Sequence, residues 1–415
     1  MYEKIVLPNG VRILHEYIPH VRSVSFGIWV GTGSRYENAA MSGASHFIEH
    51  MLFKGTKTHT AAELAAILDG IGGQVNAFTT KECTCFHGRV LDTHLSHLTE
   101  VLCDMFFNSK FDEDDVKNER GVILEEIDMY ADTPEDLAVE RLSSSVFKGY
   151  SLARSILGKK STLNKMTGES LRQYKANHYQ PDAIVIAVSG SFQADDITRL
   201  KDRFSALPKS GTVKFQKAEY TSSFTVKRKS LEQNHLNIAF PGICVTDQNR
   251  FALQLLSEVL GGGMSSRLFQ TVREKRGLCY SIYSYGSSYI DTGLFAVYTA
   301  LGRDTEREAI SVITEEIKRF REDGVTPDEL LRAREQLKAN VLMGLESTGT
   351  RMNRLGRNEL YFSYVPTPDE TIANYDSVTA EDIQKLAVHC LDFDKVSFSA
   401  VGKVDAAEVY KELLQ

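Results

Sequence analysis

The order of strand and helix patterns occurs twice along this chain, and that repetition narrows the folds open to it. Alternating or continuous apolar residues in the first half predict strands at residues 4–7, 11–16, 24–30, 73–79, 84–91 and 183–189. A similar series in the second half predicts strands at residues 223–228, 237–240, 280–288, 292–300 and 395–401. Helical patterns lie between the strands in both halves, and 415 residues are enough for two hydrophobic cores. We therefore predict an α+β fold of two similar lobes.

A stretch with little helical periodicity separates the two halves. It begins with Pro208 and contains Ser210, Gly211 and Thr212, a composition typical of a linker. We predict an N-terminal lobe at residues 1–207, a linker at residues 208–222 and a C-terminal lobe at residues 223–415. Two lobes of about 200 residues agree better with the usual size of domains than three unrelated ones would.

Composition and charge exclude several classes of protein. Hydrophobic residues make up 42% of the chain and charged residues 25%, which is ordinary for a globular protein. The net charge of -7 argues against sequence-independent nucleic-acid binding, because that activity needs a basic face. No apolar stretch approaches the roughly 20 residues of a membrane span, and the first residues do not resemble a secretory signal. None of the 6 cysteines forms Cys-x-x-Cys, so we expect reduced cysteines in a cytoplasmic protein that binds neither nucleic acid nor membrane.

The most informative segment is Ser-His-Phe-Ile-Glu-His-Met-Leu-Phe at residues 45–53. On a helix, His46 and His50 lie four residues apart and project from one face, so both imidazoles can reach one metal ion. Glu49 lies three residues after His46 and shares that side of the helix. The alternative is a pair of core histidines and a glutamate that satisfy one another. The pattern favours a zinc site, which needs a third protein ligand and an open position for water.

The candidate for that third ligand lies on a predicted helix further along the chain. Glu119 and Glu126 are seven residues apart, so they point the same way two turns from each other, alongside Val122, Ile123 and Tyr130. We expect this carboxylate stripe to be partly buried, with a metal ion compensating its charge. The alternative is a solvated acidic face.

The order His46-x-x-Glu49-His50 is the inverted zinc-peptidase motif, and Glu126 follows His50 by 76 residues within a pattern Glu-x-x-x-x-x-x-Glu. Together they resemble the pitrilysin/insulinase superfamily of zinc peptidases, in its short, processing-peptidase-like bacterial form. Further segments extend the resemblance over nearly the whole length, at residues 7–11, 31–35, 54–56, 72–80 and 179–182. The resemblance implies two homologous lobes, each a mainly antiparallel sheet packed with helices, which enclose a chamber.

The resemblance also implies roles for the residues of the motif. His46, His50 and Glu126 would be the zinc ligands. Glu49 would be the general base, taking a proton from a water that zinc activates and passing it to the leaving amine. Glu119 would orient His50 or the metal site without being a ligand. Because the second half contains no His-x-x-Glu-His, we expect a C-terminal lobe without a metal motif and one active site per chain.

Two further sites rest on the resemblance. An edge strand would pair with an extended peptide through backbone hydrogen bonds, which assigns substrate binding to Val75, Asn76, Ala77, Phe78 and Thr79. Without the family context, the same residues also suit an ordinary interior strand. Arg273 and Tyr280, seven residues apart in the second lobe, would bind a substrate carbonyl and the tetrahedral oxyanion. From the residues alone, Arg273 is equally a surface helix residue and Tyr280 a strand residue that packs.

The expected function is that of a Zn2+-dependent endopeptidase, which hydrolyses peptides or unfolded segments bound as an extended strand. A preference for basic peptides is suggested by the net charge and by an acidic cluster of Glu125, Glu126, Asp128, Asp132, Glu135 and Asp136. The alternative is that solvated helix ends are simply acidic. We expect a homodimer, as in similar bacterial proteins. The alternative function is that of a catalytically silent partner or core subunit that acts as a peptide-binding scaffold, which the intact motif opposes.

Overall fold

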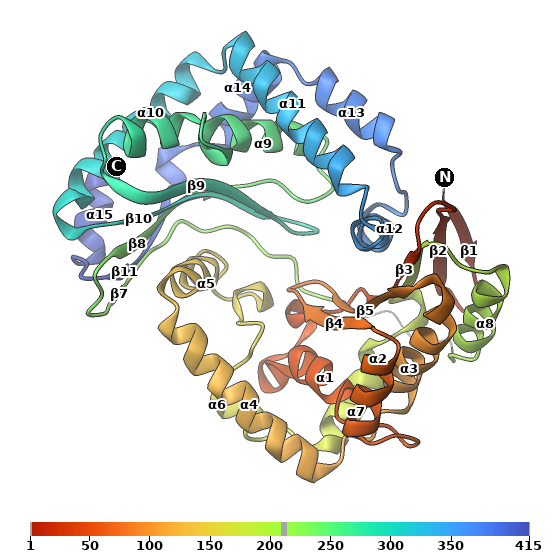
Figure 1. The fold of residues 1–415 in the computed structure, drawn as a ribbon. Coiled ribbons are helices and arrows are strands. Elements are labelled where there is room, and N and C mark those ends of the chain that lie inside the picture. The colour runs from red at the N-terminus through yellow and green to blue at the C-terminus, as the bar shows by residue number, and fades with distance from the viewer. Residues whose placement is uncertain (1, 209–213, 415) are drawn as a thin grey trace. The chain divides into compact units, whose positions relative to one another are not determined.

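The computed structural model describes residues 2–208 and 214–414, and its chain forms two compact units (Figure 1). The first comprises Met1–Ile127, Arg154–Gln216 and Met343–Thr367, and the second Asp128–Ala153, Lys217–Leu342 and Pro368–Gln415. Residues 128–153 therefore pack with the second unit, and residues 343–367 return to the first. Of the linker expected at residues 208–222, residues 209–213 lie outside the described residues.

The sheet of the first unit has six strands, of which only β2 and β6 are parallel neighbours. Its order is β1 (Glu3–Val6), β2 (Arg12–Tyr17), β6 (Ile184–Gly190), β3 (Ser23–Val30), β5 (Thr84–Leu91) and β4 (Gln74–Thr79). The central strand β6 is buried along its whole length, in agreement with its uninterrupted apolar sequence. β4 lies at one edge of the sheet, as the resemblance implies for a strand that pairs with a peptide.

The sheet of the second unit repeats this arrangement with five strands. Its order is β7 (Phe224–Arg228), β11 (Ser397–Gly402), β8 (Asn234–Pro241), β10 (Gly293–Leu301) and β9 (Cys279–Ser288). The first pair is parallel and the other three pairs are antiparallel, which matches the series β2, β6, β3, β5 and β4 of the first unit. The prediction of a mixed α and β fold with two similar lobes is confirmed.

Helices cover both sheets. Those of the first unit are α1 (Ala44–Leu52), α2 (Ala61–Gly70), α3 (Leu95–Asn108), α6 (Lys160–Leu163), α7 (Gly168–His178), α8 (Ala194–Ser205) and α12 (Thr348–Phe362). Those of the second unit are α5 (Pro134–Val146), α9 (Arg250–Ser257), α10 (Glu306–Asp323), α11 (Pro327–Gly344, whose last residues belong to the first unit), α13 (Pro368–Ser377), α14 (Ala380–Cys390) and α15 (Ala407–Leu414). Helix α4 (Glu113–Asp132) begins in the first unit, and its last residues belong to the second.

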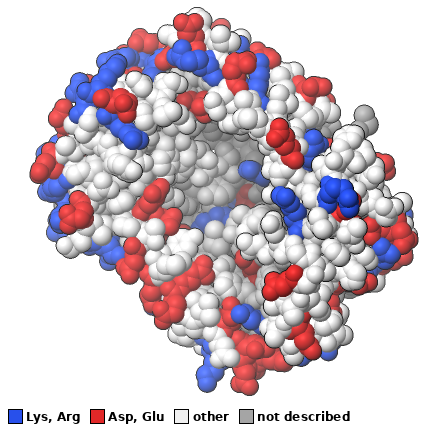
Figure 2. Space-filling view, viewed as in Figure 1, with Lys and Arg blue, Asp and Glu red and all other residues white. Residues whose placement is uncertain are grey.

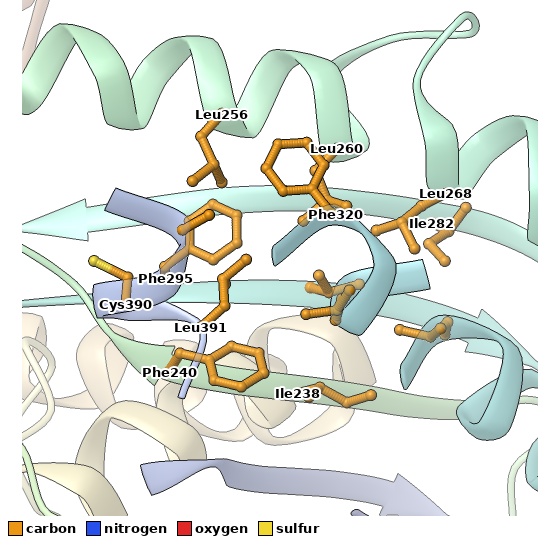
Figure 3. Close-up of a cluster of buried hydrophobic side chains, with 14 of the residues drawn as sticks. Ile238, Phe240, Leu256, Leu260, Leu268, Ile282, Phe295, Phe320, Cys390 and Leu391 are labelled. Carbon is orange, nitrogen blue, oxygen red and sulfur yellow. The ribbon is translucent and has the colours of Figure 1, made fainter. Parts of the chain in front are cut away.

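Each unit has its own hydrophobic core. In the second unit, side chains from β8 and β10 pack against those from α9, α10 and the end of α14 (Figure 3), as illustrated by Phe240, Leu256, Phe295 and Phe320. Among the described residues, none of the helices is both long enough and apolar enough to cross a membrane. The 6 cysteines all lie in the described residues, and none of them is paired with another in a disulfide.

Candidate metal centre

Helix α1 carries the His-x-x-Glu-His motif and is fixed at its first turn by a buried carboxylate. The chain enters the helix through Gly43, whose φ of 99° is a left-handed conformation that favours glycine. The two carboxylate oxygens of Glu37 accept the backbone N–H groups of Gly43 at 2.7 Å and Ser45 at 2.8 Å. These bonds satisfy donors that the helix itself leaves unpaired. Burial raises the pKa of Glu37 to about 8, against the lowering effect of the two backbone bonds.

Three potential ligand atoms converge between α1 and α4. The Nε2 atoms of His46 and His50 lie 3.2 Å apart, and each lies 3.6 Å from Glu126 Oε2. A tetrahedral zinc ion with ligands at about 2.0–2.1 Å would separate its ligand atoms by about 3.4 Å. The measured separations therefore suit a single small ion, and the three residues form a group whose ligand atoms all lie within 4.8 Å of one another.

The two histidines differ in the hydrogen-bond partner of their second ring nitrogen, Nδ1. His50 Nδ1 lies 2.7 Å from Glu119 Oε1, and Lys54 Nζ lies 2.7 Å from Glu119 Oε2. Burial opposes ionisation of Glu119, but the hydrogen bonds from His50 and Lys54 outweigh it and lower the pKa of this carboxyl. His46 Nδ1 is buried without a hydrogen-bond partner among residues 2–208 and 214–414. Burial and the neighbouring His50 lower the pKa of His46 to about 3, which keeps its imidazole neutral at neutral pH, as a metal ligand must be.

Glu49 lies on the same side of α1 and is held by the strand β4. Thr79, the last residue of that strand, donates its hydroxyl to Glu49 Oε2 at 2.5 Å. Burial raises the pKa of Glu49, and the Thr79 bond opposes the rise. A carboxyl whose affinity for a proton is increased in this way suits proton transfer near neutral pH.

The strand expected to bind substrate is an edge strand whose side chains alternate between two faces. It pairs with β5 on one side, and no other described strand pairs with it. Val75 and Ala77 pack against the core of the first unit, and Thr79 contacts Glu49 from the same face. Phe78 on the opposite face packs edge-on against Trp29.

Arg273 and Tyr280 belong to the second unit and lie close to each other. The Arg273 guanidinium is 5.6 Å from the centroid of the Tyr280 ring and 4.7 Å from that of Phe269. Tyr280, the second residue of β9, is 74% exposed. Sequence reasoning missed Phe269, which precedes Arg273 by four residues on the same helical segment.

The carboxylate stripe on α4 is partly buried, as expected, but two of the three apolar residues expected beside it are exposed. Val122 is 51% exposed and Tyr130 is 43% exposed, so the carboxylate stripe is not flanked by buried side chains there. Its burial comes instead from Ile123 and from the contact of Glu119 with α1. Sequence reasoning also missed the partner role of Lys54, although this residue follows His50 by four positions.

Comparisons with known proteins find relatives along nearly the whole chain. The family model of the insulinase family (peptidase family M16) matches residues 12–160, and the model of the peptidase M16 inactive domain matches residues 165–337. The uncharacterized zinc protease YmxG of Bacillus subtilis is 43% identical over 388 residues, covering 93% of this chain and 95% of the relative. An uncharacterized zinc protease of Streptomyces coelicolor is 39% identical over 411 residues, covering 96% of this chain and 89% of the relative.

Solved structures with the same fold are more distant in sequence. A structure described as a peptidase M16 inactive domain from Pseudomonas fluorescens superposes with a TM-score of 0.90 at 20% identity, covering 98% of both chains. A protease from Helicobacter pylori gives a TM-score of 0.89 at 19% identity, covering 97% of this chain and 99% of that one. A chain of complex III2 from Candida albicans gives 0.85 at 19% identity, covering 99% of both chains. At these identities the likeness shows the fold alone.

Proposed function

The chain belongs to the insulinase family of peptidases (family M16), and on that premise we propose that it is a zinc-dependent endopeptidase acting on peptides or unfolded segments. The observation that carries the proposal is the convergence of ligand atoms from His46, His50 and Glu126 beside the carboxylate of Glu49. Relatives 43% and 39% identical to this chain are named zinc proteases, which agrees with the proposal.

The residues present suit zinc. Two imidazole nitrogens and one carboxylate oxygen are a donor set that catalytic zinc sites use, and three protein ligands leave one position open. Zinc held by His46, His50 and Glu126 would supply Lewis acidity beside the scissile peptide bond. Glu119 accepts a hydrogen bond from the Nδ1–H group of His50, which leaves the Nε2 lone pair of His50 available to the ion. Lys54 holds the other oxygen of the same carboxylate.

Glu49 is the residue that moves the proton. Its carboxylate takes a proton from the attacking water and returns it to the amine that leaves. Partial burial supports this exchange, because it raises the pKa of Glu49 toward the pH at which the enzyme would work. The two carboxylates thus have different tasks, since Glu126 would be a ligand of the metal and Glu49 transfers the proton.

The substrate is an extended peptide that pairs with β4 through residues 75–79. Backbone pairing at a sheet edge tolerates many side chains, which suits a peptidase with unfolded substrates. Arg273 is proposed to bind a substrate carbonyl, and Tyr280 the oxyanion. Acidic side chains gather where α4 and α5 lie in the space-filling view (Figure 2). Asp128 and Asp132 of α4 and Asp136 of α5 are exposed. We therefore propose a preference for basic peptides. A peptide whose Lys and Arg residues are replaced by Gln should be cleaved more slowly than the original peptide. The difference between the two rates should shrink at high salt.

We further propose that the protein works as a cytoplasmic homodimer. A catalytically silent scaffold is the competing function, because the same fold occurs in a chain of complex III2 from Candida albicans. The complete ligand set argues against it. A scaffold of that kind would bind no stoichiometric zinc, so metal analysis of the purified protein separates the two functions.

The decisive experiment compares the wild type with Glu49→Gln on a mixed peptide library, with the products identified by mass spectrometry. The matched control is Glu125→Gln, which makes the same change of charge on an exposed position of α4. We expect cleavage by the wild type and by the control, and none by Glu49→Gln, with zinc content unchanged in all three proteins. Equal behaviour of wild type and Glu49→Gln would refute the assignment of the base.

A further inference from the structure

Thr79 joins the proposed substrate strand to the proposed base. Its hydroxyl lies 2.5 Å from Glu49 Oε2, at the short end of the range for hydrogen bonds between a hydroxyl and a carboxylate. The bond connects two elements 30 positions apart in sequence. The same strand that would align the peptide therefore also contacts the group that would move the proton.

Thr79, the donor of this hydrogen bond, is held in place by the short hairpin between β4 and β5. Thr79 pairs with Thr84 of β5, and the Thr80 N–H donates to the Cys83 carbonyl at 2.8 Å to close the turn. Within that turn, the buried Glu82 carboxylate forms an ion pair with the buried guanidinium of Arg35. A buried pair of this kind is costly to break, so the end of β4 has little freedom to move.

Helix α1, which carries Glu49, is held in place as firmly as the end of β4. Glu37 holds the first turn of α1 through two backbone N–H groups, and Phe47 and Ile48 anchor the helix in the core. Glu49 is therefore a flexible side chain between two rigid elements. Several rotamers are open to a partly exposed glutamate, and each rotamer-rich side chain that is held in one of them loses entropy. A specific bond is needed to select one orientation.

We propose that Thr79 is a positioning residue for hydrolysis, whose hydroxyl holds Glu49 Oε2 so that the peptide-binding strand itself orients the carboxylate that takes the proton. The inference rests on the proposed function of Glu49 and β4. The hydroxyl acts through Glu49, whereas the main-chain groups of β4 that pair with a peptide are unchanged by a substitution of this side chain. Loss of the hydroxyl should thus reduce turnover and leave substrate binding intact.

The test uses two substitutions at the same site. Thr79→Val is nearly isosteric and removes the hydroxyl, whereas Thr79→Ser keeps the hydroxyl and removes a methyl group. The matched control is Thr84→Val on the partner strand β5. The Thr84 hydroxyl donates to the Thr32 carbonyl at 2.9 Å and not to Glu49. For each protein, kcat and KM are measured on one peptide that the wild type cleaves, together with zinc content and thermal unfolding.

We expect Thr79→Val to lower kcat roughly tenfold to a hundredfold, with KM within about twofold of the wild type, because misplaced catalytic groups cost rates of that order. Thr79→Ser and Thr84→Val should retain most of the activity, and all proteins should bind zinc. An unchanged kcat in Thr79→Val, a rise of KM alone, or an equal loss in Thr79→Ser would each overturn the proposal.

Crystal structures of the wild type and Thr79→Val give a readout that does not depend on activity. Glu49 should occupy one position in the wild type and a different position, or several, in the variant. The same single conformer in both would overturn the role of Thr79. If instead the wild type cleaves no peptide, the proposed function fails by that result, and the two crystal structures still decide whether Thr79 positions Glu49.

Discussion

Replacing Glu119 by glutamine should weaken zinc binding, although Glu119 is not placed among the metal ligands. Each of its carboxylate oxygens holds a different donor at 2.7 Å, namely His50 Nδ1 and Lys54 Nζ. Glutamine offers only one acceptor at this position. If its oxygen faces His50, its NH2 group confronts the Lys54 ammonium. If it faces Lys54, the NH2 group confronts the N–H of His50, and the ring must rotate or change tautomer.

Either arrangement leaves one donor without its partner. The cost is about 1–3 kcal/mol for the N–H of His50, whose side chain is 21% exposed, and smaller for the Lys54 ammonium, whose side chain is 36% exposed and reaches solvent. Only the part of this cost that falls on the zinc-bound state weakens binding. Substitution of a residue that orients a metal ligand typically weakens metal binding about 10–100-fold, which corresponds to about 1.4–2.7 kcal/mol of binding free energy. We therefore expect the zinc dissociation constant of Glu119→Gln to rise about 10–100-fold.

The assay is competition between the metal-free protein and a chromophoric chelator, with circular dichroism to verify the fold. Glu125→Gln serves as the control, because Glu125 is an exposed neighbour on α4 and the change of charge is the same. A dissociation constant for Glu119→Gln equal to that of the control would refute the reasoning. It would mean that the bond between Glu119 and His50 has no effect on the metal.

Three further predictions concern stability and metal removal. In the second unit, burial opposes ionisation of Glu329, but hydrogen bonds led by those from Arg267 lower its pKa to about 2 from an ordinary value of 4.5. The stabilisation from the ionised Glu329 is therefore complete above pH 4.5 and is lost as the pH falls toward 2. Glu329→Gln should lower the free energy of unfolding in urea by about 1–3 kcal/mol at pH 7 and by less at pH 4. Gly356→Ala should destabilise the protein by about 1–3 kcal/mol in the same assay, because a Cβ at position 356 would lie 2.2 Å from Trp29 Nε1. Gly121→Ala on α4 is the control, since a Cβ there meets open space and the substitution should be neutral or stabilising. Equal effects of the two substitutions would contradict this reasoning. A chelator should abolish peptidase activity and added zinc restore it, with circular dichroism unchanged; unfolding on chelation would contradict a fold that rests on two hydrophobic cores.

Local patterns predicted the elements that carry the site, because the relevant spacings are short. Helical periodicity placed His46 and His50 on one face of α1 and separated Glu119 and Glu126 by two turns of α4. In β4, Thr79 shares a face with Val75 and Ala77, and only the fold brings α1 to that face. No local pattern reveals such a meeting, since each element is consistent with many partners.

Residues that act through sequence-distant contacts escaped prediction for the same reason. Glu37 precedes α1 by seven residues and belongs to no periodic pattern, yet its burial and its two backbone bonds define the start of the helix. Val122 and Tyr130 satisfied the helical pattern expected of a buried stripe and are nevertheless exposed. A periodic pattern shows which residues share a face, but it does not show what covers that face.

The return of α12 to the first unit has a consequence for the metal centre. In β3, Ile28 belongs to the core beside α1, whereas Trp29 points to the opposite face and packs with Met352 and Leu355 of α12. Glu359 of the same helix is buried against Lys4 at 2.6 Å. An indole buries about 200 Å², which contributes about 5 kcal/mol at roughly 25 cal/mol per Å². That is comparable to the whole net stability of a typical domain, about 5–15 kcal/mol. Residues 343–367 supply part of this burial, so we expect the sheet that supports α1 and β4 to be less stable when they are removed from the first unit.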